Sequence, residues 1–178
     1  MALTASKKKR PDSAAGLRRG PAFGRGASGR LSQLSLKGRA LKYLAQREHS
    51  RHELQRKLAP HAESAEQLQA LLDDLERDKF LSAPRFVESL VRRRVARFGI
   101  RRIEQELDQH RLPDETTGPA LLALRQSERD RALEVWRKRF GEPPADLAER
   151  GRQQRFLAQR GFEGETIAWV FKRASDKL

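Results

Sequence analysis

Two histidines stand three residues apart in the stretch REHSRHELQRKL, which covers residues 47–58. Imidazole nitrogens bind zinc, but a zinc site takes three or four protein ligands at suitable spacing. His61 follows a proline and His110 lies far along the chain, so neither completes a set with His49 and His52. The chain also has no cysteine. We therefore predict no metal and no cofactor, and we interpret His49 as a linker residue and His52 as an exposed residue in the first turn of a helix.

Four carboxylates crowd a short stretch, at Asp73, Asp74, Glu76 and Asp78. Acid–base catalysis needs opposed groups in a dry cleft, whereas neighbouring positions on a helix point in different directions. No glycine-rich phosphate loop follows a strand pattern, and no nucleophile elbow or Ser-His-Asp spacing is present. We interpret the carboxylates as a solvated face or as a contact for another basic surface, and we predict that the protein is not an enzyme.

Arginines are concentrated in one part of the chain, where residues 85–102 hold seven of them and one acidic residue. A guanidinium stays charged and can bind a carboxylate or a phosphate in a fork. One interpretation is a binding surface. The other is charge that merely keeps a helical protein soluble, in which Arg102 and Glu106 form an ordinary surface pair at four-residue spacing.

Positive charge dominates the 178 residues, with 38 lysines and arginines against 24 aspartates and glutamates, a formal +14. This balance favours a polyanionic partner such as nucleic acid. Residues 1–34 carry eight cations and one anion, and their Gly-, Ala- and Ser-rich sequence shows no period, so we predict a disordered basic arm there. The arm either samples a phosphate backbone or only solubilises the chain. No apolar run could span a bilayer and no signal peptide is evident, so we expect a soluble, cytoplasmic protein.

From Ser35 onward, apolar residues recur three and four apart, which predicts an all-α class. The first three helices are expected at 36–47, 51–59 and 65–78. Start signals support these positions, because Ser50 precedes Glu53 by three residues and Ser64 precedes Gln67 by three, as in a capping box. Ser127 and Asp130 repeat the spacing further along. The start of the sixth helix stays open between 114 and 118, since a start at Asp114 would place Pro119 inside the helix.

The helices group into units. The expected division is a basic arm at 1–34 and three-helix repeats at 35–81, 82–126 and 127–178. Leu54 and Leu58 correspond to Ile103 and Leu107 at one offset of 49, which favours an internal duplication. The aromatic residues of the last unit, Phe156 among them, are interpreted as core residues rather than as stacking platforms for bases.

In this order, four segments resemble the RecX family, bacterial modulators of the RecA recombinase. They are ALKYLAQREHSRHELQRKL, FLSAPRFVESLVRRRVARFGIRRIEQELDQH, RKRFGEPP and RQQRFLAQRGFEGETI. Where the family usually has a glycine before the aromatic-leucine pair, this chain has Lys79. The resemblance implies three tandem three-helix repeats in an elongated, curved array. It also implies binding in the groove of the RecA nucleoprotein filament and inhibition of ATP hydrolysis, strand exchange and co-protease activity.

Two hypotheses for function remain open. The first is a non-enzymatic inhibitor, expected to be monomeric, whose arginine faces contact recombinase carboxylates or the bound DNA. The second is an independent, sequence-nonspecific binder of single- or double-stranded DNA, which the basic arm and the charge favour. The candidate partner-binding residues are Arg51, Arg92, Arg93, Arg97, Arg101, Arg102, Arg155 and Arg160.

Overall fold

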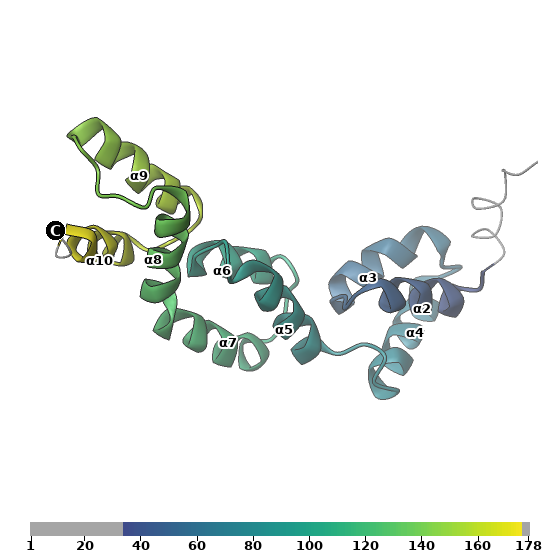
Figure 1. The fold of residues 1–178 in the computed structure, drawn as a ribbon. Coiled ribbons are helices and arrows are strands. Elements are labelled where there is room, and N and C mark those ends of the chain that lie inside the picture. The colour runs from purple at the N-terminus through teal and green to yellow at the C-terminus, as the bar shows by residue number, and fades with distance from the viewer. Residues whose placement is uncertain (1–33, 176–178) are drawn as a thin grey trace, which may run out of the picture. The chain divides into compact units, whose positions relative to one another are not determined.

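The computed structural model describes residues 34–175, and every regular element in that range is a helix. Figure 1 shows the helices following one another in chain order. The all-α prediction is therefore confirmed for this range. The basic arm predicted at residues 1–34 lies, apart from Leu34, outside the described residues. No helix in 34–175 is long and apolar enough to cross a membrane.

The first group of helices consists of α2 (Leu36–Gln46), α3 (Arg51–Leu58) and α4 (Ala65–Arg77), with a short 3₁₀ turn, η1 (Ala59–His61), after α3. The second group consists of α5 (Ala83–Arg94), α6 (Ile100–Asp108) and α7 (Asp114–Gln126). The third consists of α8 (Glu128–Arg139), α9 (Leu147–Gln159) and α10 (Gly164–Ser175).

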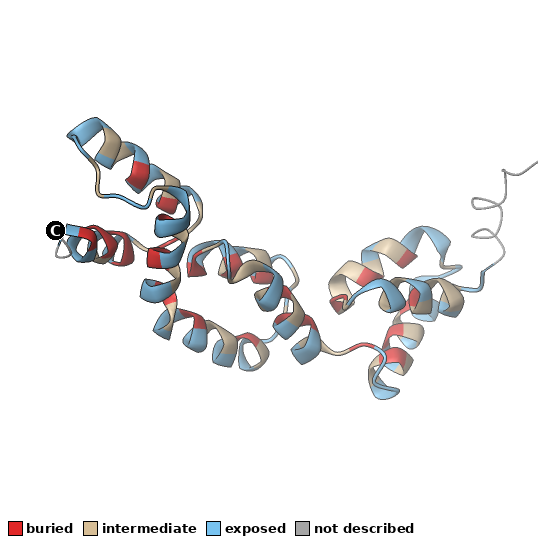
Figure 2. Cartoon of the chain, in the orientation of Figure 1, coloured by how far each residue is buried: buried red, intermediate tan, exposed pale blue. Residues whose placement is uncertain are grey.

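Each group buries its own apolar cluster, and the buried residues lie between neighbouring helices in Figure 2. The three clusters are centred on Leu54, Leu58 and Leu72, on Phe86, Ile103 and Leu107, and on Trp136, Leu157 and Val170. A helix of eight to thirteen residues is marginal alone, so these small cores are what stabilise the elements. The exact repeat boundaries stay a prediction.

Side-chain caps explain most helix starts. The hydroxyl of Ser50 accepts the Glu53 N–H at 3.1 Å, and the hydroxyl of Ser64 accepts the Gln67 N–H at 3.2 Å. Both predicted caps are thus present. The cap predicted at Ser127 is wrong, because only this residue separates α7 from α8 and its backbone is not extended. Its hydroxyl instead donates to the carbonyl of Ala123 at 2.9 Å.

The sixth helix begins at the early limit of its predicted interval. α7 starts at Asp114, follows Pro113 as its N-cap, and keeps Pro119 inside the helix. A proline at this point removes one hydrogen bond. The first turn is still closed, since the N–H groups of Thr116 and Thr117 bond to the carbonyl of Pro113 at 2.9 and 3.3 Å.

Candidate functional site

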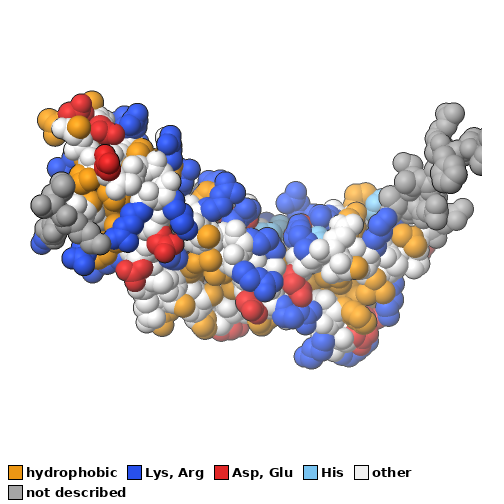
Figure 3. All heavy atoms as spheres, in the orientation of Figure 1, with side chains coloured by type: hydrophobic (Ala, Val, Ile, Leu, Met, Phe, Trp, Pro, Cys, Tyr) orange, Lys and Arg blue, Asp and Glu red, His pale blue; other side chains and the backbone are white. Residues whose placement is uncertain are grey.

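The arginines are the candidate site residues, and they differ in the groups that contact each guanidinium. In the first group and at its junction with the second, arginines are paired with carboxylates. Where the second group meets the third, three of them lie against aromatic rings. Figure 3 shows that Lys and Arg side chains recur over all three groups on the face drawn there, so the pairing of each residue matters more than its presence.

Arg51 is the clearest paired arginine. Its guanidinium lies 2.7 Å from Asp73, 2.7 Å from Glu76 and 2.8 Å from the amide oxygen of Gln69. Partial burial would lower the pKa of Arg51, but its bonds to Asp73 and Glu76 and their charges raise it overall. Part of the carboxylate cluster therefore meets a basic side chain of the same chain. Arg51 links α3 to α4, and few of its donors are left for a partner.

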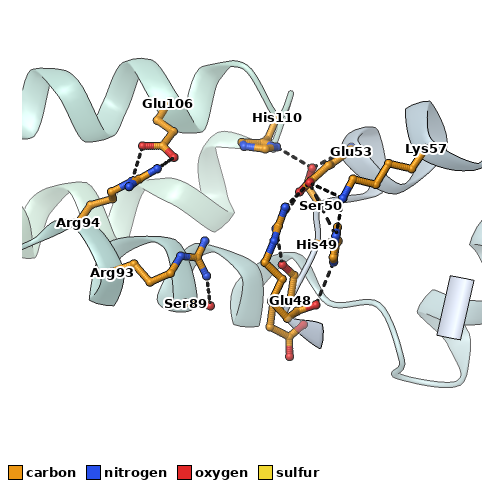
Figure 4. Close-up of polar contacts among 11 residues, drawn as sticks. Glu48, His49, Ser50, Glu53, Lys57, Ser89, Arg93, Arg94, Glu106 and His110 are labelled. Atoms are coloured by element: carbon orange, nitrogen blue, oxygen red, sulfur yellow. Dashed lines mark hydrogen bonds and ion pairs between the residues drawn. The ribbon is translucent and has the colours of Figure 1, made fainter. Parts of the chain in front are cut away.

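The first junction joins the first group to the second through polar side chains (Figure 4). The hydroxyl of Ser50 lies 2.8 Å from Nδ1 of His110, and Arg85 contacts Glu48 at 2.8 Å. Ser50 accepts the Glu53 N–H through one lone pair, and its hydroxyl either donates to or accepts from Nδ1 of His110 according to the imidazole tautomer. One residue thus caps α3 and binds the end of α6.

Two histidines are embedded in this junction. His49 is 1% exposed, with Nδ1 at 2.9 Å from the carbonyl of Arg47 and Nε2 at 3.2 Å from the ammonium of Lys57. His110 packs edge-on against the ring of Phe86. Burial lowers the pKa of both His49 and His110. His49 does lie in a linker, as interpreted, but its burial was not foreseen; within the described part of the chain no group of residues has the makings of a metal site.

Other arginines near the first junction are also largely paired. Arg94 binds Glu106 through two bonds of 2.8 Å, so the Arg102–Glu106 pair considered from spacing gives way to an arginine from α5. Arg47 binds Glu53. Among residues 34–175, Arg93 bonds only to the hydroxyl of Ser89, at 2.6 Å. Burial, followed by the nearby charges of Arg47 and Arg94, lowers the pKa of Arg93.

The second junction joins the second group to the third through the main chain. The Gly99 N–H donates to the carbonyl of Arg160 at 2.9 Å, and the Arg101 N–H donates to the carbonyl of Gly161 at 3.1 Å. A Cβ on Gly99 would lie under 3.0 Å from the backbone of Gly161, and a Cβ on Gly161 would lie as close to Arg102. Gly161 also has φ +81°, so this approach requires glycine at both positions.

A buried carboxylate completes the second junction. Glu128, at the start of α8, is 2% exposed and accepts the Ile100 N–H and the Thr166 hydroxyl, both at 2.8 Å. Ile100 is the first residue of α6, whose N-cap, Gly99, has no side chain to offer. Glu128 therefore caps α6 from the next group, where a negative charge also suits the helix dipole.

Three arginines at the second junction lie over phenylalanine rings, and we call Arg97, Arg139 and Arg160 the stacked arginine cluster. The guanidinium carbon of Arg160 is 3.6 Å from the ring centre of Phe156. That of Arg139 is 5.4 Å from the ring centre of Phe140, and that of Arg97 is 5.8 Å from that of Phe98.

The stacked arginine cluster is a connected arrangement. Phe140 and Phe156 meet edge to face with ring centres 5.1 Å apart, which joins the supports of Arg139 and Arg160. Arg97 lies beside Arg160 because Gly99, two residues later, bonds to the Arg160 carbonyl. Burial, and then the charges of Arg97 and Arg139, lower the pKa of Arg160. None of the three forms an ion pair with a carboxylate among residues 34–175.

The eight predicted arginines are thus only partly brought together. Arg97, Arg101, Arg102 and Arg160 meet at the second junction, Arg93 faces the first, and Arg51 is bound within the first group. Arg92 and Arg155 are exposed on α5 and α9. Arg139 was missed. A usable signal existed, since Arg97–Phe98 and Arg139–Phe140 are both Arg-Phe dipeptides just beyond or at the end of a helix.

Known proteins resemble the chain along most of its length. Residues 127–171 match a family model described as "RecX, third three-helix domain". The chain is 56% identical over 142 residues to the regulatory protein RecX of Leptothrix cholodnii, covering 80% of this chain and 90% of the relative. It is 52% identical over 145 residues to that of Ralstonia pickettii, covering 82% and 91%. A crystal structure of RecX from Lactobacillus salivarius shares the fold with a TM-score of 0.66 at 17% identity, covering 84% of this chain and 99% of the other.

Proposed function

Because this chain belongs to the RecX family, we propose that it binds the RecA nucleoprotein filament and inhibits the recombinase, ATPase and co-protease activities of RecA. In this role it modulates DNA repair and recombination. The observation that carries the proposal is the identity of more than half of the aligned residues over 80% of the chain to a protein named regulatory protein RecX. The family resemblance supplies the filament as the target.

The distribution of charge supports a filament of protein and DNA as the partner. The guanidiniums at the second junction have no carboxylate partner among residues 34–175. Their positive charge is therefore not neutralised by an ion pair there and can attract an anionic surface. Opposite charge on two surfaces speeds encounter and fixes orientation. We therefore place the principal contact with the filament at the second junction, with Arg93 as a further contact at the first.

The proposed mode is binding without catalysis. Glu128, the buried carboxylate at the second junction, has both oxygens engaged by Ile100 and Thr166. His49 and His110 at the first junction bond to a hydroxyl, a carbonyl and an ammonium of the same chain. These groups stabilise the contacts between neighbouring helix groups. We therefore infer that the chain inhibits RecA by occupying a site on the filament.

A titration of RecA ATPase activity on single-stranded DNA tests the proposal. Adding the full chain at or below the RecA concentration should lower the rate of ATP hydrolysis. A rate that stays unchanged up to stoichiometric addition would refute the central claim. Neutralising the stacked arginine cluster in an R97Q/R139Q/R160Q variant should weaken inhibition at least tenfold.

The control for that variant removes the same charge from elsewhere. Arg77, Arg125 and Arg152 are exposed and each lies within 3.5 Å of a carboxylate oxygen. Exposed ion pairs of this kind add little to stability. An R77Q/R125Q/R152Q variant should inhibit nearly as well as the unmodified chain, so a loss confined to the first variant assigns the effect to position and not to net charge.

A second candidate function is sequence-nonspecific DNA binding with no dependence on the recombinase. The formal charge of +14, half of it in residues 1–34, favours this alternative. Deleting residues 1–34 separates the two. Loss of DNA binding with inhibition intact supports the filament-directed regulator, whereas parallel loss of both supports the DNA-binding protein.

A further inference from the structure

Three arginines of the second junction are held in a different way from Arg51 of the first group and Arg94 of the second. Arg51 and Arg94 each bind carboxylates at 2.7–2.8 Å, so their charge is balanced within the chain. Arg97, Arg139 and Arg160 lie against Phe98, Phe140 and Phe156 and have no carboxylate partner among residues 34–175. Arg94 is also 5.9 Å from the Phe98 ring centre, but Glu106 binds its donors. A ring covers one face of a guanidinium without using its N–H donors. The stacked arginines are therefore held in place while their donors remain largely available.

The surroundings of the stacked arginine cluster add further positive charge. The N–H of Arg101 bonds to the Gly161 carbonyl, and the backbone of Arg102 lies directly against Gly161. Arg131 of α8 also donates to the carbonyl of Phe98 at 2.9 Å, so six arginines belong to this junction. Its buried carboxylate, Glu128, is engaged by Ile100 and Thr166 and forms no ion pair among the described residues. A ligand that fills this surface must carry several negative charges close together.

Arg160 shows what kind of ligand fits. One face of its guanidinium lies on the Phe156 ring at 3.6 Å, and one of its N–H groups donates to the Phe156 carbonyl at 3.2 Å. Arg160 is only partly buried, so part of this residue is accessible to a ligand. Unstacked bases pack on guanidinium planes, whereas bases inside a duplex cannot. A chain of phosphates with accessible bases meets both requirements.

We propose that the stacked arginine cluster binds single-stranded nucleic acid, with Arg97 and Arg139 contacting phosphates and Arg160 contacting a phosphate while its face opposite Phe156 receives a base. The inference rests on the proposed function, because it names the single-stranded DNA of the filament as the component that this junction contacts. Recombinase carboxylates are then left to other surfaces of the chain.

The test is binding of the full chain, without recombinase, to a fluorescently labelled oligothymidylate, followed by fluorescence anisotropy across a salt series. Each phosphate contact on a single strand contributes a slope of about −0.7 in log affinity against log salt. The R97Q/R139Q/R160Q variant should therefore have a slope shallower by about 2 and an affinity lower by about 100-fold at 0.1 M salt. The matched R77Q/R125Q/R152Q variant should keep the original slope.

A second variant isolates stacking from charge. Arg160→Lys keeps the positive charge but lacks the planar face, so it should keep the salt slope while binding several-fold more weakly. Circular dichroism of each variant confirms that the helices are retained. Equal losses in the two triple variants, or an unchanged slope in R97Q/R139Q/R160Q, would overturn the proposal. So would a duplex of the same length that competes as well as the single strand.

Failure of the nucleic-acid site can be distinguished from failure of the proposed RecA inhibition. The oligothymidylate assay contains no recombinase, so it can succeed even if the chain leaves RecA ATPase activity unchanged. If R97Q/R139Q/R160Q binds the oligonucleotide normally but no longer inhibits RecA, the cluster contacts recombinase carboxylates. That outcome would overturn the nucleic-acid site and leave the filament-binding regulator standing.

Discussion

The two junctions occupy corresponding places in successive groups but are built from different chemistry. At the first, the N-cap residue of α3, Ser50, meets His110 near the end of α6 through side chains. At the second, the N-cap residue of α6, Gly99, meets Arg160 at the end of α9 through main-chain atoms. Side chains can change rotamer or protonation state, whereas two backbones in contact tolerate little change. We infer that the second junction is the more rigid platform and the first the more adjustable one.

The largest expected effect comes from adding a methyl group at the second junction. In Gly99→Ala the new Cβ would lie under 3.0 Å from the backbone of Gly161, which cannot move away as a flexible side chain could. Overpacking of this kind costs about 3 kcal/mol. Urea denaturation should show that loss. Gly164→Ala is the control, because a Cβ there meets nothing within 4 Å and should change the free energy of unfolding by less than about 0.5 kcal/mol. Equal midpoints for the two variants would contradict the rigid junction.

The caps of α3 and α6 provide the next comparison. Glu128→Ala leaves the Ile100 N–H and the Thr166 hydroxyl without their acceptor in a buried position, which should cost about 2–4 kcal/mol in the free energy of unfolding. Ser50→Ala removes a local cap and a bond to His110, and should cost about 1 kcal/mol. Thermal or urea unfolding of both variants measures the difference. A smaller loss for Glu128→Ala than for Ser50→Ala would reverse the ranking of the junctions.

Local features of these junctions could be predicted from the sequence, and tertiary ones could not. The caps at Ser50 and Ser64 depend on residues three positions away, so a short window contains both partners. The cap at Ser127 was wrong because the end of α7 lies one residue before it. Glu128 lies next to that position, yet its partners at Ile100 and Thr166 are 28 and 38 residues away, and no window shows them.

The candidate site divides in the same way. An excess of arginine was visible in the composition, but whether a guanidinium is paired depends on residues brought near by packing. Arg51 was predicted to contact a partner, and its carboxylates at Asp73 and Glu76 come from a different helix. Phe156 was interpreted as a core residue, and it does pack against the third core while also supporting Arg160. Sequence patterns identify the apolar face of a helix, but they do not show which charged side chains pack at the edge of that face.

Acidification should affect the first junction selectively. Burial holds the pKa of His49 and His110 below the usual 6.5, so the unfolded chain takes up protons at these positions before the folded chain does. Stability is therefore full above pH 6.5 and falls as the pH drops below it. Unfolding midpoints between pH 7.5 and 5 should show this decline, and NMR titration of the two rings should show the lowered pKa values.

His110→Gln is the informative variant for the acid response. Glutamine keeps a polar group near Ser50 but does not titrate in this range. The decline in stability below pH 6.5 should be shallower in this variant than in the unmodified chain. His61→Gln, which replaces an exposed histidine after α3, is the matched control. An equal decline in the unmodified chain and in His110→Gln would show that other groups dominate.

The smallest expected effect is a gain in stability at the first junction. Arg111 has φ +51° and Gly161 has φ +81°, so both have a left-handed backbone conformation. They occupy corresponding positions 50 residues apart, each just after the second helix of its group. Only Gly161 is pressed against a neighbouring backbone, which is why an arginine can occupy the first position. Left-handed backbone strains a residue with a Cβ, and glycine removes this strain at some cost in unfolded-state entropy. Arg111→Gly should therefore raise the free energy of unfolding by about 0.5 kcal/mol, whereas Arg111→Ala, which keeps the Cβ, should not. Urea denaturation of the pair measures the difference, and a gain in both variants would attribute it to charge instead of backbone conformation.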